Sequence, residues 1–234
     1  MKNYKVILAS KSIGRFKTLK SAGITPYVLS PELDESLIIK KTAKGRRLNT
    51  KKAVQILAKA KGEEAVKMLN SKISNDEISN VNGEMSNVNG EISNAKILLA
   101  GDSLFEFHHK VFGKPKNYEI AKKRLKAMSG KTGNLFSAIY IYNIKSKTEA
   151  LIVDQAKVTI SSLDDEDIEN YLSTGEPYLV AGGFTIDGLG GPFIKKVNGD
   201  PHTVIGMPLP ALRLALKKMN IEWFEILDKV QNIG

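Results

Sequence analysis

The strongest constraint on the fold is an apolar run that ends in a charged residue. Residues 97–101 read Ile-Leu-Leu-Ala-Gly and are followed directly by Asp102 and Ser103. A short run of this composition is typical of a buried strand, and in α/β proteins ligands bind where such strands emerge at their carboxyl ends. We therefore predict that Asp102 ends a buried strand at the rim of a sheet. The alternative is an aspartate that only stabilises a turn or caps a helix.

The length and composition are those of an ordinary globular protein. The chain has 234 residues, of which 42% are hydrophobic, enough for one core or for two lobes that share a cleft. The sequence contains no cysteine, which excludes disulfides, thiolate metal sites and a cysteine nucleophile. The apolar stretch near the start is too short for a signal peptide, and no later window is long enough to span a membrane. We therefore expect a cytoplasmic protein.

The chain carries an excess of positive charge. Its 35 basic and 25 acidic residues give a formal net charge of +10, which favours polyanionic partners such as nucleotides, nucleic acid or acidic lipid headgroups. Seven of the cations lie in residues 40–52, without an aromatic residue that could stack on a base. This basic cluster is typical of a solvated loop that leads into a helix, so the sequence does not favour stable nucleic-acid binding.

Hydrophobic periodicity and turn residues indicate alternating strands and helices. The helix that we predict to be capped by Thr50 is expected to end near Leu69, and residues 31–36 are expected to form an acidic loop. The whole pattern predicts an α/β fold, in which a mixed, twisted sheet is flanked by helices. The predicted strands are 6–10, 27–29, 97–102, 111–112, 135–144, 150–160 and 223–226, and the predicted helices are 14–22, 50–69, 118–128, 165–172 and 209–219.

A seven-residue repeat interrupts this pattern. The segment Glu-Ile-Ser-Asn-Val-Asn-Gly at 77–83 is nearly repeated at 84–90 and repeated in part at 91–94. A coiled coil needs two apolar positions in each heptad with good helix formers between them, whereas asparagine, serine and glycine make a weak helix. We therefore predict a low-complexity surface loop at about 71–95 within a single domain that spans residues 1–234.

The loop after the first predicted strand is suited to an anionic ligand. Ser10, Lys11, Ser12 and Arg15 lie there, where backbone N–H groups and the positive end of the helix dipole favour a phosphate. The loop lacks the glycine spacing of a P-loop, and an ordinary helix cap explains it as well.

Two carboxylates are candidates for a metal site. Glu35 and Asp102 both follow predicted strands, and Mg²⁺ prefers such oxygen ligands when it is shared with substrate phosphates. The histidines do not predict a metal site: His108 and His109 are adjacent, so that on a strand they would point to opposite faces, and His202 is distant in sequence. We expect structural or surface roles for all three histidines.

In order along the chain, these segments resemble the Maf family of nucleoside-triphosphate pyrophosphatases, also called septum-formation inhibitor-like proteins. The resemblance runs nearly end to end, and the repeat falls in a connection that is usually much shorter in the family. The segments that carry it are Leu8-Ala9-Ser10, Leu33-Asp34-Glu35, Leu57 to Lys61, Ala100 to Ser103, Gly113-Lys114-Pro115, Met128 to Gly130, Tyr171 to Pro177, Ala181-Gly182, Gly188 to Gly191 and Val204 to Leu209.

The resemblance implies an activity: hydrolysis of a nucleoside triphosphate to the monophosphate and pyrophosphate, which clears non-canonical or excess nucleotides. It implies two lobes around a nucleotide-binding cleft, Mg²⁺ or Mn²⁺ as the cofactor, and a possible homodimer. By the same resemblance, Asp102 accepts the proton of the attacking water and faces the metal, together with Glu35. The expected phosphate contacts are Ser10, Arg15, Lys61 and Lys114, although the two lysines, each considered alone, are typical surface cations.

Three positions depart from the pattern of the dTTP- and UTP-hydrolysing branch. Gly14 stands where one of two paired arginines is usual, Ser103 where threonine is common and Asp187 where glutamine is common. These positions are associated with substrate choice, so the preferred base stays open. Near an anionic substrate, Asp187 would need a metal, a base amino group or solvent to offset charge repulsion. The alternative function is that of a catalytically silent relative that binds a protein or nucleic acid.

Overall fold

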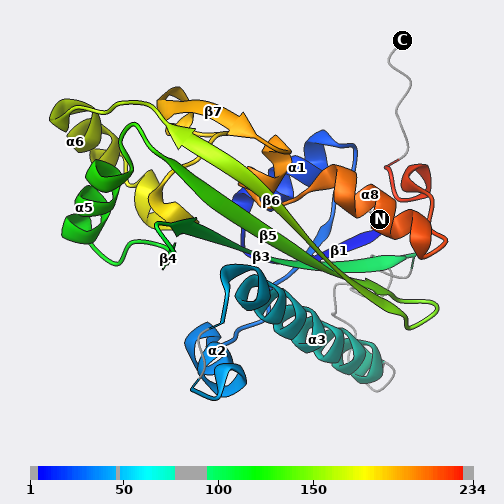
Figure 1. Ribbon diagram of the computed structural model, residues 1–234. Helices are drawn as coiled ribbons and strands as arrows, with labels where there is room; N and C mark the ends of the chain where they lie inside the picture. Colours follow the sequence, from blue (N-terminus) through cyan, green and yellow to red (C-terminus); the bar gives the residue numbers. More distant parts are fainter. Residues whose placement is uncertain (1–4, 46–47, 77–93, 229–234) are drawn as a thin grey trace, which may run out of the picture.

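The computed structural model describes residues 5–45, 48–76 and 94–228. Its centre is a seven-stranded sheet in the order β2-β1-β3-β5-β6-β7, with β4 paired to β3 off this path. Helices flank the sheet on both faces (Figure 1), which confirms the predicted α/β class. The strands are β1 Val6–Ala9, β2 Tyr27–Leu29, β3 Ile97–Phe107, β4 Lys110–Phe112, β5 Thr132–Asn143, β6 Glu149–Ile160 and β7 Ile194–Asn198.

The helices begin and end at residues suited to capping. The side chains of Ser12, Asn117 and Asp164 accept backbone N–H groups at the starts of α1, α5 and α6. Gly23, with φ of +82°, follows the end of α1. The helices are α1 Ile13–Ser21, α2 Glu35–Ala43, α3 Thr50–Asp76, α5 Tyr118–Met128, α6 Asp165–Ser173, α7 Pro201–Ile205 and α8 Leu209–Lys218.

The sheet is mixed, as predicted. β1 runs parallel to both β2 and β3, and these connections cross over through helices. From β3 onward the neighbours β5, β6 and β7 are antiparallel, and β5 and β6 form the predicted hairpin. β3 therefore joins a small parallel part of the sheet to a larger antiparallel part.

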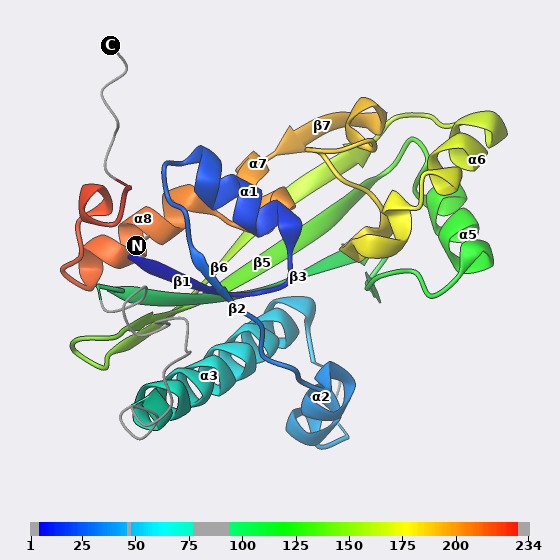
Figure 2. The ribbon, with the colours of Figure 1, turned by 180° about the vertical axis from the view of Figure 1, so that it is seen from behind.

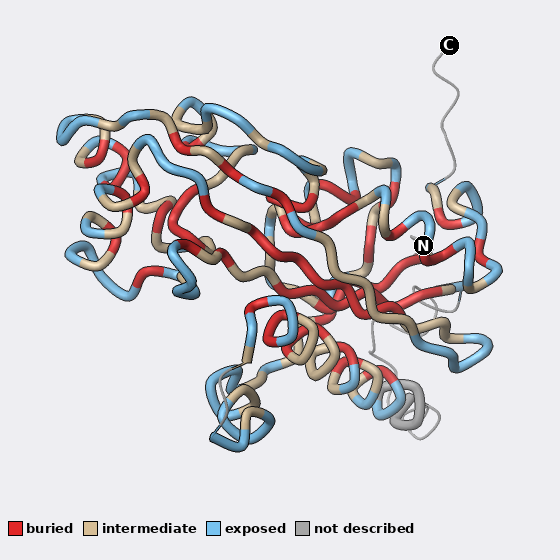
Figure 3. Tube along the Cα trace, viewed as in Figure 1, coloured by how far each residue is buried: buried red, intermediate tan, exposed pale blue. Residues whose placement is uncertain are grey.

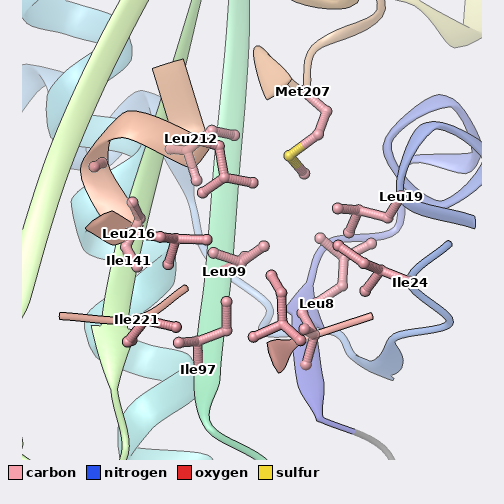
Figure 4. Close-up of a cluster of buried hydrophobic side chains, with 14 residues drawn as sticks. Leu8, Leu19, Ile24, Ile97, Leu99, Ile141, Met207, Leu212, Leu216 and Ile221 are labelled. Atoms are coloured by element: carbon pink, nitrogen blue, oxygen red, sulfur yellow. The ribbon is translucent and has the colours of Figure 1, made fainter. Parts of the chain in front are cut away.

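Alternation along β1 places its side chains in two separate cores. Val6 and Leu8 pack with residues of α1 and α8, a cluster that Figure 4 shows around Leu8, Leu19 and Leu212. Ile7 and Ala9 point to the other face and pack against α3. Figure 2 shows α3 on one side of the sheet, opposite α1 and α8, and Figure 3 shows continuous burial along the central strands. Both faces of β1 are therefore fully covered.

A further core lies at the far end of the molecule. There the second half of β3 and the strands β5 and β6 pack against α5 and α6, and Phe105 is fully buried between them. Within the described ranges, no helix combines the length and the apolar character that crossing a membrane requires.

The prediction that Asp102 ends a strand was wrong. β3 runs eleven residues from Ile97 to Phe107, because β5 pairs with it as far as Glu106 and β4 pairs with its last three residues. It is β1 that stops, at the pair Ala9 and Ala100. Asp102 therefore lies in the middle of a long strand, just beyond the end of its short parallel neighbour.

The predictions around α2 and α3 also need correction. The acidic loop 31–36 gives way at Glu35 to α2, which Asp34 caps and which contains the first lysines of the basic cluster. α3 is capped by Asn49, whose side chain accepts Lys52 N–H at 2.7 Å, whereas the Thr50 hydroxyl bonds to Glu106. α3 continues to Asp76, so the predicted loop at 71–95 begins too early. Residues 77–93, which contain all of the repeat except its last residue, lie outside the described residues, as do residues 46–47 of the basic cluster.

Four short segments differ from the prediction because local patterns do not specify them. Residues 223–226, predicted as a strand, contain the 3₁₀ turn Trp223–Glu225. His108 and His109 lie in the turn between β3 and β4, both with positive φ, and not on a strand. The edge strand β7 and the five-residue helix α7 were not predicted.

Candidate active site

A lysine lies between two carboxylates beside the end of β1. Lys61 Nζ is 2.7 Å from Glu35 Oε1 and 2.9 Å from Asp102 Oδ2. The three residues come from α3, the first turn of α2 and the middle of β3. The side chains of Asp102 and Lys61 are 11% and 19% exposed, and that of Glu35 is 52% exposed. Lys61 and Asp102 thus form a largely buried ion pair, and Glu35 lies at its solvent side.

Strand alternation explains why Asp102 meets this lysine. Leu98 and Ala100 pack against α3 residues that include Ala65, and side chains two residues apart on a strand share a face. Asp102 therefore points toward α3. Lys61 precedes Ala65 by about one helical turn, so the face of α3 that packs on the sheet also carries the lysine.

The opposite face of β3 receives a buried arginine. Arg15, in the first turn of α1, is 8% exposed and donates three hydrogen bonds: from Nη1 to Ser10 Oγ at 3.0 Å, from Nη2 to Ser103 Oγ at 2.9 Å, and from Nε to the Gly206 carbonyl at 2.9 Å. Burial lowers the pKa of Arg15, and the negative charges of Asp102 and Glu35 oppose this effect. The two carboxylates therefore act on Arg15 as well as on the lysine.

Two glycines permit this close packing. A side chain at position 101 would place its Cβ 2.9 Å from Arg15 Nε, and one at position 206 would place its Cβ 2.9 Å from Ser103 Oγ. Gly206 also has φ of +106°, a conformation that other residues rarely adopt. The guanidinium can reach β3 only because both positions lack a side chain.

A cavity of about 390 Å³ lies beside the second half of α1. Asp187 borders it, and a Cβ at Gly14 would lie 3.7 Å from Asp187 Oδ2 and 3.0 Å from Ile205 Cγ2. The structure thus brings together Gly14 and Asp187, two of the three positions that depart from the family pattern. The lining residues are Lys17, Thr18, Ser21, Ala22, Asp187, His202, Ile205 and Leu209.

Comparison with known proteins identifies the family. The family described as Maf-like protein matches residues 5–219. This chain belongs to the Maf-like family.

Several relatives of this Maf-like chain carry the name nucleoside triphosphate pyrophosphatase. The one from Leifsonia xyli is 34% identical over 229 residues, which cover 96% of this chain and 97% of that protein. The one from Salinispora tropica is 36% identical, covering 93% of this chain and 84% of its own. The one from Trichodesmium erythraeum is 32% identical, covering 95% and 98%.

The Maf-like fold gathers most of the site residues named from the sequence. Contacts link Glu35, Lys61 and Asp102 on one face of β3, and link Ser10, Arg15 and Ser103 on the other. Lys114 lies exposed in the loop after β4; within the described ranges, no hydrogen bond or ion pair joins it to this cluster. The structure therefore groups all of these residues except Lys114.

The donor set at this site suits a divalent cation only together with a phosphate ligand. Within the described part of the chain, no group of three or more histidine, aspartate and glutamate side chains could hold a metal ion. Glu35 and Asp102 supply two carboxylates, and Mg²⁺ is commonly held by one or two carboxylates plus phosphate oxygens and water. The residues fit a metal that binds with the substrate, not an ion that the protein holds alone.

Sequence reasoning missed three groups that support the site. Ser137 on β5 bonds to Ser103, Thr203 on α7 accepts from Ser137 through its carbonyl, and the Gly206 carbonyl accepts from Arg15. Ser137 was detectable, because it is a lone polar residue in the apolar run 135–139. The two carbonyls belong to the backbone, so no side-chain pattern could reveal them.

Glu176 organises the glycine-rich segment that carries Asp187. Its carboxylate accepts hydrogen bonds from the hydroxyls of Tyr171 and Thr185 and from the backbone N–H groups of Leu189 and Gly190, at 2.7 to 3.0 Å. Burial acts to raise the pKa of Glu176, but the hydrogen bonds outweigh it, so the pKa is lowered. The charged carboxylate thereby holds both sides of the segment together.

Lys61→Met is expected to lower the free energy of unfolding by about 1 to 3 kcal/mol, because it leaves the buried Asp102 without its nearest cation. Urea denaturation at neutral pH measures this change. The matched control is Lys59→Met on the same helix, whose partner Glu149 is 47% exposed, and its loss should be at most about 1 kcal/mol. Equal losses in the two variants would contradict a special role for the Lys61 pair.

Glu176→Gln is expected to cost about 1 kcal/mol of stability at pH 7. Because the folded-state pKa is depressed, this stabilisation is present above the unfolded value of about 4.3 and is lost as the pH falls through the folded pKa. The free energies of unfolding of the unchanged protein and of Glu176→Gln, measured by denaturation, should therefore differ less and less from pH 7 to pH 3. The exposed Glu222→Gln is the control, and a difference for Glu176→Gln that grows toward acid pH would refute the assignment.

Proposed function

We propose that this chain hydrolyses a nucleoside triphosphate between its α and β phosphates, with Mg²⁺ or Mn²⁺ as the cofactor. The observation that carries the proposal is the cluster in which Lys61 joins Asp102 to Glu35, beside the buried Arg15. The names of the relatives support the same reaction class. The products are the nucleoside monophosphate and pyrophosphate, and the proposed role is to clear non-canonical or excess nucleotides.

In this proposal Asp102 is the general base. Its carboxylate is held on two sides, by Lys61 Nζ at 2.9 Å and by the Ser103 backbone N–H at 2.7 Å. The oxygen of a water molecule bonds to the α phosphorus while the bond from that phosphorus to the α–β bridging oxygen breaks. Asp102 takes the proton of the water, and pyrophosphate leaves with the bonding electrons.

The cations of the site are proposed to bind the phosphates. Arg15 has two further N–H donors, one on each Nη, for which the described residues supply no partner, and Lys61 provides a second positive charge. Fixed charges of this kind stabilise a transferring phosphoryl group and its leaving group. Ser10 lies next to Arg15 as a hydroxyl contact, and we assign Lys114 to the outer phosphates.

Glu35 and Asp102 would hold the metal. When bound, it would neutralise phosphate charge and lower the pKa of the attacking water. Lys61 already balances the two carboxylates without it, so their mutual repulsion does not prevent the site from forming.

Asp102→Asn tests the reaction, because asparagine keeps the shape and the hydrogen-bond acceptor but cannot take the proton. Pyrophosphate release from a panel of canonical and modified nucleoside triphosphates is expected to fall about 100-fold or more, and EDTA should abolish release by the unchanged protein. Glu149→Gln, which removes a charge that pairs with Lys59 and not with the cluster, is the control. Release of inorganic phosphate in place of pyrophosphate, or full activity of Asp102→Asn, would refute the proposal.

The second candidate function is that of a silent relative that acts through a protein or nucleic-acid partner. Gly14 favours it, since this position carries no cation beside Arg15. In that case no nucleoside triphosphate yields pyrophosphate with either metal, and Asp102→Asn leaves the biological function intact.

The pair Gly14 and Asp187 is proposed to set the base preference. Glycine leaves the space between α1 and Asp187 open, and an ionised carboxylate only accepts hydrogen bonds. A base that presents an amino group pairs with Asp187, whereas the carbonyl oxygens of thymine and uracil meet it with repulsion. Ser103 acts differently, since its hydroxyl is bonded to Arg15.

Asp187→Asn is expected to reduce the preference for amino-bearing bases over dTTP by roughly tenfold in kcat/KM, the worth of one charged hydrogen bond. Steady-state kinetics with dATP, dCTP, dGTP and dTTP measure the ratio. Asp165→Asn at the start of α6, whose carboxylate pairs with Lys126 of α5, is the control. A preference that is unchanged in Asp187→Asn would place the base elsewhere.

A further inference from the structure

A chain of hydrogen bonds leads from Arg15 into the interior of the sheet. Arg15 Nη2 is 2.9 Å from Ser103 Oγ, which is 2.8 Å from Ser137 Oγ, which is 2.8 Å from the Thr203 carbonyl. A guanidinium can only donate and a carbonyl can only accept. The direction is therefore fixed: Arg15 donates to Ser103, Ser103 donates to Ser137, and Ser137 donates to Thr203.

The inner end of this chain is anchored in buried structure. Ser137 and Thr203 are fully buried, and the Thr203 hydroxyl donates to Asp154 on β6 at 2.6 Å. Thr203 belongs to α7, and Gly206, which ends α7, accepts Arg15 Nε. The guanidinium is thus held twice by the same structural unit, once through the two serines and once through the Gly206 carbonyl.

We propose that Ser137 is a positioning residue for Arg15. It does not touch the substrate; it orients the Ser103 hydroxyl, which fixes Nη2 of Arg15 and so directs the two remaining N–H donors. This inference rests on the proposed function in assigning those donors to phosphate oxygens. The orientation itself depends only on the contacts within the protein.

Removal of the Ser137 hydroxyl has a specific consequence. In Ser137→Ala the Thr203 carbonyl loses a buried donor, and Ser103 loses its acceptor and becomes free to rotate, whereas Arg15 keeps its bonds to Gly206 and Ser10. The expected result is a less ordered Nη2, not the loss of the arginine from the site.

Kinetics of pyrophosphate release test this coupling. Ser137→Ala is expected to lower kcat/KM roughly tenfold, which corresponds to about 1.4 kcal/mol, and to have no further effect in a Ser103→Ala background, because the two serines act in series. Ser129→Ala is the matched control: its hydroxyl makes two hydrogen bonds to Leu163, far from Arg15, and kcat/KM should not change. Additive effects of Ser103→Ala and Ser137→Ala would overturn the proposal.

Two measurements keep the test independent of catalysis and of misfolding. The NMR signals of the Arg15 side-chain N–H groups should be sharp in the unchanged protein and broadened in Ser137→Ala. The affinity of Ser137→Ala for inorganic tripolyphosphate should be roughly tenfold lower, the same factor as for kcat/KM. Ser137→Cys keeps a weak donor, so its signal widths and its affinity for tripolyphosphate should lie between those of the unchanged protein and Ser137→Ala. It replaces the alanine variant if that variant does not fold. If the unchanged protein hydrolyses no nucleotide, the proposed function fails; unchanged Arg15 signals in Ser137→Ala and Ser137→Cys would overturn the positioning role itself.

Discussion

The site depends on a difference in length between two neighbouring strands. β1 has four residues and β3 has eleven, so the parallel pairing ends at Ala100 while β3 continues, supported on its other side by β5. Asp102 and Ser103, the second and third residues beyond this end, point to opposite faces of the sheet. Each therefore meets a cation from a different helix, Lys61 from α3 and Arg15 from α1.

Burial fixes the charges of Arg15 and Lys61 in place for a charged ligand, but it also means that the fold must supply acceptors for both side chains. A buried guanidinium is costly unless acceptors surround it, and the acceptors of Arg15 are two hydroxyls and one backbone carbonyl. Lys61 is balanced by two carboxylates. Charges fixed in this way need little rearrangement when a charged ligand binds, which is the basis of electrostatic preorganisation.

The sequence could predict most residues of the candidate site, but not which of them contact one another. Apolar runs and cap residues placed β1, α1 and α5 close to their observed bounds, because these signals are local. The extension of β3 beyond Asp102 was not predicted, because a charged residue after an apolar run was interpreted as the end of the strand, whereas pairing with β5 continues beyond it. α2 was missed for a similar reason: its helix carries no buried residue, so it lacks the periodicity on which prediction relies.

The sequence by itself determined the family, the α/β class and the charged residues available for chemistry, because each of these is written in residue type and local spacing. Tertiary structure decided which of them meet. Lys61 and Asp102 are 41 positions apart, and Arg15 reaches Gly206 across 191 positions. Such contacts follow from strand register and helix packing, which arise only when distant segments bury their apolar faces together. The same packing places Ser137, the lone polar residue of an apolar run, within a buried chain of hydrogen bonds.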